Sequence, residues 1–230
     1  MAGRLLQLLA RRPALIVSLP SNSPDLARAA AEGGADALKV HLHVRHEASG
    51  TQFGDLAAER ANLEGILAAG LPTGVVPGAG DDLPTPEEMR ELAAMGVDFF
   101  DLYAHDMPAW MIGFEGMTRA IALSDSWTAA SMEEYAGLGF ELLEAAIVPH
   151  GGYGKPLSVD DIAAYRQVRA ATNLPIIVPT QRAIRPEEVA TLVRSAGVNA
   201  IMIGVIVAGR EPSSLRAATK RFTSAIAELA

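Results

Sequence analysis

The stretch AEGGADALKVHL, residues 31–42, contains the unit from which the whole chain is built. A helix ends at glycine and the chain continues directly into a short apolar run of the kind that forms a buried strand. Glycine suits this position because it adopts the left-handed conformation that ends helices at little cost. The same unit recurs as LAAGLPTGVV (67–76), AAMGVDFFDLY (93–103), AGLGFELLEAAIV (136–148) and RSAGVNAIMIGV (194–205). The repetition predicts alternating helices and strands.

Counting the apolar runs gives eight strands, and alternating β and α units specify a parallel sheet. Eight units in 230 residues predict an α/β protein with one (β/α)₈ TIM barrel domain over residues 1–230. A doubly wound open sheet is the alternative, although it normally carries fewer strands. The predicted strands are Leu15–Leu19, Ala37–Val44, Thr73–Pro77, Phe99–Tyr103, Ala120–Ser124, Leu142–Val148, Ile176–Pro179 and Ala200–Val205.

Two parts of the chain depart from the regular unit. Residues 1–13 predict a short amphipathic helix before the first strand. The fourth unit is the weakest, because MPAWMIGFEGMT (107–118) is short for a helix. The last helix is predicted from about Ser213 to Leu229.

Composition excludes several classes of function. The formal charge of −8 argues against a nucleic-acid partner or an anionic membrane, because either needs a basic surface. The chain has no cysteine, which excludes disulfides, thiolate nucleophiles and cysteine-ligated metals. No apolar run reaches membrane-spanning length and no signal peptide is evident, so we expect a cytoplasmic protein. A small anionic partner fits if donors cluster locally, and a homodimer is possible.

The second predicted strand has an unusual polar face. Lys39, His41 and His43 alternate with apolar residues, and side chains two apart on a strand share a face. We therefore expect all three to point into the barrel mouth. Active sites of TIM barrels lie at the carboxyl ends of the strands, and all five histidines fall there: His41, His43, His46, His105 and His150.

Three residues are candidates for catalysis. Burial of Lys39 would lower the pKa of its amine, which could then act as a base, a Schiff-base nucleophile or an anion ligand. The alternative is a structural ion pair with Asp101 or Glu144. His41 suits proton transfer near neutral pH. Asp125 follows the fifth strand, where catalytic carboxylates belong, although it could instead cap the next helix.

Further residues around the same mouth are candidates for binding. The loops after strands seven and eight, PTQRAIRPEE (179–188) and IGVIVAGRE (203–211), occupy the place where many barrels bind phosphate. For phosphate we expect Gln181, Arg182, Gly204 and Val205. For the rest of the substrate we expect His43, Tyr103, His105, His150 and Thr180.

A divalent metal is the alternative use of the histidines. His41 and His43, with His105 or His150, could hold a metal ion and a reactive water. A single His-x-His pair is weak support for such a site, and no second paired-ligand motif exists. We expect no other cofactor.

With these features the chain resembles the phosphate-binding TIM barrels of the ribulose-phosphate-binding type, and most closely the N-acetylmannosamine-6-phosphate 2-epimerases. The resemblance extends over nearly the full length in strand order and spacing. It is carried by ALIVSLP (14–20), AEGGADALKV (31–40), GVVPG (74–78), ALSDS (122–126), IIVPTQRAIRPEEV (176–189) and AIMIGVIVA (200–208). It implies a phosphosugar held by its phosphate at Arg182 and Gly204.

The resemblance also implies which family residues this chain lacks. Pro77 stands where the family has its catalytic lysine, and Thr180 where it has its catalytic glutamate. The remaining matched site positions hold Lys39 for an arginine, His41 for a glutamate, Tyr103 for an acid, and the retained Asp125.

These observations favour an enzyme that acts on a small phosphorylated or anionic carbonyl compound, of the isomerase, epimerase or aldolase-like lyase type. Lys39 would polarise or covalently bind the carbonyl, and His41 would move the proton, with Asp125 assisting. One alternative is a metal-dependent hydrolase built on His41 and His43. Another is a barrel that binds a phosphorylated ligand without catalysis.

Overall fold

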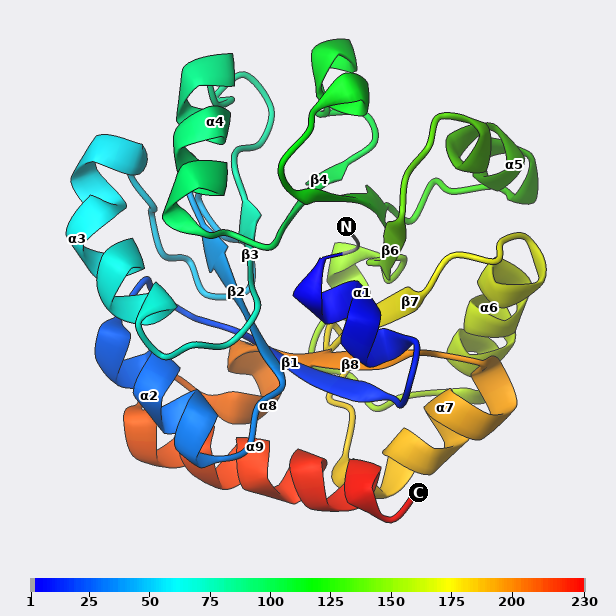
Figure 1. The fold of residues 1–230 in the computed structure, drawn as a ribbon. Helices are drawn as coiled ribbons and strands as arrows, with labels where there is room; N and C mark the ends of the chain where they lie inside the picture. The colour runs from blue at the N-terminus through cyan, green and yellow to red at the C-terminus, as the bar shows by residue number, and fades with distance from the viewer. Residues whose placement is uncertain (1–2, 230) are drawn as a thin grey trace.

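The computed structural model describes residues 3–229, and its eight strands form one closed barrel. Each strand runs parallel to the next in sequence order, and β8 pairs with β1 to close the ring. The predicted TIM barrel is therefore confirmed (Figure 1). The strands are β1 (Ala14–Ser18), β2 (Ala37–His41), β3 (Thr73–Val76), β4 (Phe99–Tyr103), β5 (Thr118–Leu123), β6 (Leu142–Ala145), β7 (Ile176–Pro179) and β8 (Ala200–Ile203).

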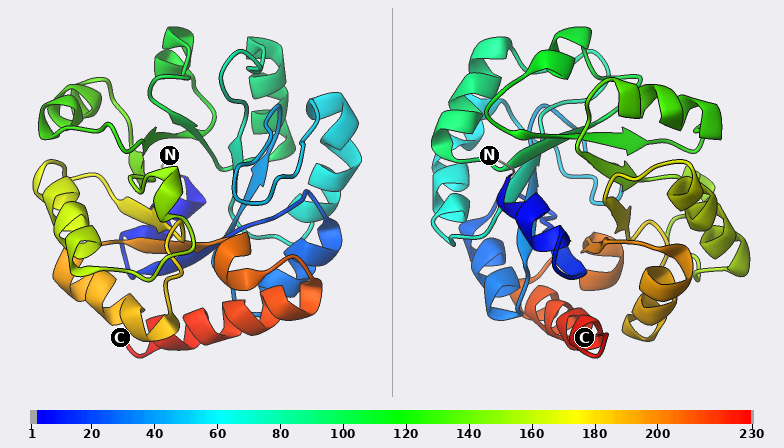
Figure 2. Two further views of the ribbon diagram at one scale, coloured as in Figure 1. Left: turned by 180° about the vertical axis from the view of Figure 1, so that it is seen from behind. Right: turned by 45° about the vertical axis from the view of Figure 1, so that its right-hand side comes forward.

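The helices that follow β1 surround the barrel as an outer ring (Figure 2), whereas the first helix lies across one end of it. The fourth unit has only a short 3₁₀ helix, η1 (Ala109–Gly113), as its sequence predicted. Two more such turns are η2 (His150–Gly152) and η3 (Pro186–Glu188). The α-helices are α1 (Arg4–Leu9), α2 (Pro24–Glu32), α3 (Leu56–Leu67), α4 (Pro86–Met95), α5 (Ala129–Gly137), α6 (Val159–Ala170), α7 (Val189–Ala196), α8 (Val205–Ala208) and α9 (Pro212–Ala227).

The amino-terminal end of the barrel is closed by apolar packing. Leu5 and Leu9 of the predicted short helix α1 join a buried cluster with Phe99 and Leu142 from the strands. Figure 1 shows α1 lying across the middle of the ring. Gly74 makes room for the Phe99 ring, because a Cβ at Gly74 would lie 2.1 Å from it. This end is therefore filled by apolar side chains, and the cavity described below lies at the other end.

Strand β2 ends earlier than predicted, at His41 instead of Val44. His43 adopts a left-handed backbone conformation (φ 54°) and is the only non-glycine among residues 3–229 with positive φ. A strand requires extended backbone, so the two-residue alternation stops at His41. The prediction that His43 continues the face of Lys39 is wrong for this reason.

No helix within the described part of the chain is both long enough and apolar enough to cross a bilayer.

Candidate active site

A cavity of about 340 Å³ opens at the carboxyl ends of the strands. Its walls follow the alternation of a barrel interior, in which each layer takes its side chains from every second strand. The even strands supply the floor, and the odd strands supply the layer above it. The floor consists of Lys39, Asp101, Glu144 and Met202. The layer above it consists of Ser18, Val76, Ala122 and Pro179. The mouth consists of His41, Tyr103, Ala146 and Gly204.

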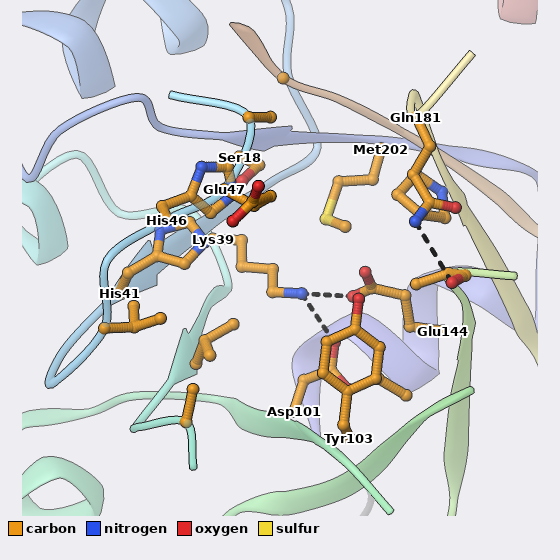
Figure 3. A pocket seen from close by; sticks show the side chains of 18 of the residues that line it. Ser18, Lys39, His41, His46, Glu47, Asp101, Tyr103, Glu144, Gln181 and Met202 are labelled. Carbon is orange, nitrogen blue, oxygen red and sulfur yellow. Dashed lines mark hydrogen bonds and ion pairs between the residues drawn. The ribbon is translucent and has the colours of Figure 1, made fainter. Parts of the chain in front are cut away.

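The centre of the floor is a buried group of three charged residues (Figure 3). Nζ of Lys39 donates a hydrogen bond of 2.7 Å to Oδ2 of Asp101 and a second one to Oε2 of Glu144. The side chains of Lys39, Asp101 and Glu144 are 5%, 1% and 8% exposed. The ion pair considered from the sequence is thus present, with both carboxylates at once, yet the cavity stays open above it.

Burial and mutual charge set the protonation of this group. Burial alone would lower the pKa of Lys39, but the charges of Asp101 and Glu144 outweigh it and raise that pKa. The expected lowered pKa is therefore wrong, and the amine is an ammonium without the lone pair that Schiff-base chemistry needs. Burial, together with the charge of Asp101, raises the pKa of Glu144, whereas Lys39 overcomes burial and lowers the pKa of Asp101.

Two imidazoles form the opposite side of the cavity. The backbone of His41 is bracketed by Asn22, which donates to its carbonyl at 2.7 Å and accepts from its N–H at 3.3 Å. The ring of His41 lies 4.5 Å from that of His46 and 4.9 Å from that of Phe53. Burial, then the neighbouring His46 and Lys39, lower the pKa of His41. His41 is therefore a neutral imidazole at the mouth.

His46 is also neutral, and its hydrogen bonds determine the tautomer. Nδ1 of His46 accepts from the backbone N–H of Ser49 at 3.1 Å, so its proton lies on Nε2. Burial and the charge of Lys39 lower the pKa of His46 to about 4. The sequence placed His46 at this end of the barrel without a role, and the structure puts it on the cavity wall.

His43 points away from this wall and toward helix α4. Its Nδ1 lies 2.9 Å from Oδ1 of Asp82 and its Nε2 lies 3.0 Å from Oε1 of Glu88. His43 is not among the cavity residues, so the expectation that it reaches the substrate has no geometric support. His41 and His43 do not converge. Across residues 3–229 no group of three metal-ligating side chains is positioned to hold an ion.

Polar contacts at the mouth join Gln181, which follows β7, to the segment that follows β6. Gln181 accepts from the N–H of Val148 at 3.0 Å and donates to the hydroxyl of Tyr153 at 2.7 Å. Tyr153 and Tyr103 both line the cavity. Because the hydroxyl of Tyr153 accepts from Gln181, its own O–H proton can be donated to a ligand.

The expected phosphate residues are only partly assembled. Gln181, Gly204 and Val205 line the cavity, and the N–H of Gly204 donates to Oγ1 of Thr180 at 3.0 Å. Arg182 instead binds Oδ1 of Asp161 at 2.9 Å and the carbonyl of Gly152 at 2.9 Å. This ion pair holds Arg182 outside the cavity residues, contrary to the expectation from the sequence. Ser158 and Asp161 also form the capping box that begins α6.

The remaining candidates lie at the rim or beyond it. His105 stacks on Tyr103 with ring centroids 5.4 Å apart, and His150 packs edge-on against Tyr153. Both histidines are cavity residues. Asp125 is exposed and does not line the cavity, so its predicted catalytic position is wrong in geometry.

Sequence reasoning underrated Asp101 and Glu144 and did not select Tyr153. A signal was present, because FFDLY and LLEA place a carboxylate inside a strand that is otherwise apolar or aromatic. Charged residues are almost never fully buried unless they are paired. Three inward positions on β2, β4 and β6 with complementary charges therefore form a detectable pattern.

Comparisons with known proteins place the fold. No protein-family model matches the sequence, and a search of curated proteins found no match. Among solved structures, a tryptophan synthase chain of Mycobacterium tuberculosis is 18% identical with a TM-score of 0.77, covering 98% of this chain and 99% of that one.

Two other similar structures are also TIM barrels. The N-acetylmannosamine-6-phosphate 2-epimerase of Clostridium perfringens is 19% identical with a TM-score of 0.60, covering 94% and 95% of the two chains. KGPDC of Streptococcus mutans is 11% identical with a TM-score of 0.64, covering 95% and 99%. The likeness to these structures agrees with the barrel fold that the resemblance implied.

Proposed function

We propose that this protein is an enzyme that enolises a small phosphorylated or otherwise anionic carbonyl compound, as isomerases, epimerases and some lyases do. The observation that carries the proposal is the ammonium group of Lys39, buried at the floor of an open cavity. A fixed positive charge in a low-dielectric site stabilises a developing enolate oxygen far better than it would in water.

Lys39 acts in this proposal as a permanent charge. Its two carboxyl partners hold the ammonium in one place, so the site needs no rearrangement when negative charge develops on the substrate. His41, a neutral imidazole on the facing wall, is the candidate that removes the proton next to the carbonyl.

The anionic end of the compound belongs at the mouth. The floor already holds carboxyl groups that would repel an anion. Above the floor, the space beside the backbone of Gly204 is open, because a Cβ there would meet no atom nearer than 3.8 Å. An anionic group can therefore approach this backbone closely. The likeness in fold to an enzyme that is named for a phosphorylated sugar supports a phosphorylated compound.

Proton exchange tests the proposal directly. Dihydroxyacetone phosphate, glyceraldehyde 3-phosphate, ribulose 5-phosphate and N-acetylmannosamine 6-phosphate are incubated with the protein in D₂O. Loss of the signal from the proton next to the carbonyl is then followed by NMR. At least one probe should exchange faster than in buffer, and Lys39→Met should abolish the gain. Absence of exchange with every probe, or full exchange by Lys39→Met, would contradict enolisation by this site.

A matched control separates the phosphate from the carbonyl. Dihydroxyacetone, which lacks the phosphate, should exchange more slowly than dihydroxyacetone phosphate because it loses the binding energy of the anionic group. Equal rates would show that the anion is not recognised.

A further inference from the structure

We propose that Glu144 is the proton donor of this site and protonates the carbonyl oxygen of the bound compound, with Asp101 as a positioning residue. This inference rests on the proposed function and adds to it the residue that supplies the acid. Neither carboxyl was a candidate for chemistry from the sequence.

The charges in the cavity floor do not balance when both carboxyl groups are ionised. Two carboxyl groups, Asp101 and Glu144, meet one ammonium, Lys39, in a layer whose side chains are almost fully buried. An uncompensated charge at such depth is strongly unfavourable, so the layer is most stable when one carboxyl is neutral. The resting group then contains one ammonium, one carboxylate and one carboxylic acid.

The two carboxyl groups also share one partner. Asp101 and Glu144 both contact Nζ of Lys39, and two ionised carboxylates in one buried site repel each other, which favours a proton on one of them. Oδ1 of Asp101 is buried without any N–H or O–H partner in the described part of the chain. A proton on Glu144 supplies the missing donor to this carboxyl pair.

Exposure and neighbouring charge determine which of the two carboxyl groups keeps the proton. Asp101 is the deeper of the two, with a side chain 1% exposed against 8% for Glu144. Figure 3 shows Glu144 beside Tyr103, with Lys39 reaching toward both carboxyls from the side of His41 and His46. Burial and the charge of Asp101 raise the pKa of Glu144, while Lys39 lowers that of Asp101. The acid is thus the more exposed of the two carboxyl groups in the cavity floor.

The transfer balances in atoms and electrons. Glu144 gives its proton to the carbonyl oxygen, and the π electron pair of the carbonyl forms the new O–H bond. The electron pair of the adjacent C–H bond becomes the C=C bond of the enol, and that proton passes to the neutral imidazole of His41. Glu144 is left as a carboxylate, which lies against the ammonium of Lys39. The reverse transfers restore the resting state.

The proton can be located without any substrate. In protein labelled with ¹³C at the glutamate side-chain carboxyl, one carbon should stay at the protonated chemical shift between pH 5 and 8. Glu144→Gln should remove this signal, and the exposed control Glu115→Gln should leave it unchanged. In Asp101→Asn the signal should move to the ionised position, because Glu144 becomes the only carboxylate available to Lys39. A wild-type spectrum with every glutamate ionised at pH 7 overturns the inference and needs no variant.

The catalytic role is tested with whichever probe exchanges in the wild type. Glu144→Gln keeps the size and shape of the side chain but lacks the acid, so exchange should fall by about 100-fold or more. Glu115→Gln should exchange normally. Unchanged exchange in Glu144→Gln overturns the role of Glu144 while the proposed function stands. If no probe exchanges at all, the proposed function fails for this panel, and the labelled spectrum still decides whether Glu144 holds the proton.

Discussion

The two ends of the barrel interior are equally buried but are stabilised in different ways. At the amino-terminal end, Phe99 and Leu142 pack with helix α1 in an apolar layer. At the carboxyl end, Asp101 and Glu144 occupy the same strands two residues further on and are buried almost as completely. Burial alone therefore does not distinguish the core from the candidate site in this protein. The two are distinguished by the presence of charged side chains at buried positions that point into the barrel.

The physical reason is the free energy of removing each kind of side chain from water. Apolar side chains gain free energy when they leave water. Charged side chains lose hydration free energy on burial. For Lys39 this loss is offset by its contacts with two carboxyl groups. The apolar layer thus constrains mainly the volume of its side chains, whereas the charged layer constrains their charge. Three substitutions test this difference.

The largest effect is expected from Lys39→Met. Removal of the ammonium leaves Asp101 with no buried cation, and breaking a buried ion pair in this way costs about 3–5 kcal/mol of stability. Urea unfolding at pH 7 measures the change. Adding Asp101→Asn and Glu144→Gln to Lys39→Met should restore much of the loss, because no uncompensated charge remains. A stable single variant would show that the pair contributes little.

An intermediate effect is expected at the other end. Leu142→Ala should cost about 3 kcal/mol, through lost burial and a cavity beneath the strands. The same unfolding measurement applies. Since Leu142 lies two residues below Glu144 on β6, exchange of any active probe should change little compared with Lys39→Met. A comparable loss of exchange would mean that the two layers are coupled through the strand.

The smallest effect concerns acid. The pKa of His46 is lowered to about 4, by burial and then by the charge of Lys39, so the folded state resists its protonation. Stability from this residue is present above pH 6.5, the ordinary value, and is lost as the pH falls toward 4. The loss is about 2 kcal/mol after allowance for partial exposure. His46→Gln should flatten the decline between pH 6.5 and 4, and an unchanged slope would contradict this.

Much of the fold could be predicted from the sequence because its signals are local. Glycine at helix ends, apolar runs of strand length and capping boxes such as Thr85 with Glu88 act within a few residues of one another. The short α1 and the incomplete fourth unit were visible for the same reason. Element ends were less accurate, and β2 illustrates this.

The site could be predicted only in part because its parts come from distant strands. Lys39 was a candidate from its position alone, but its charge state depends on partners 62 and 105 residues away. Arg182 was expected to face the cavity, and a helix-capping carboxylate, Asp161, draws it aside. No local pattern encodes such competition between partners.

By itself, the sequence determined that eight β-α units would form a ring with polar groups at its carboxyl end, since the alternation and the glycine stops are properties of neighbouring residues. Only the tertiary structure decided which polar groups meet. Closing the barrel stacks every second strand in one layer, and this brings one ammonium and two carboxyls together where water cannot separate them.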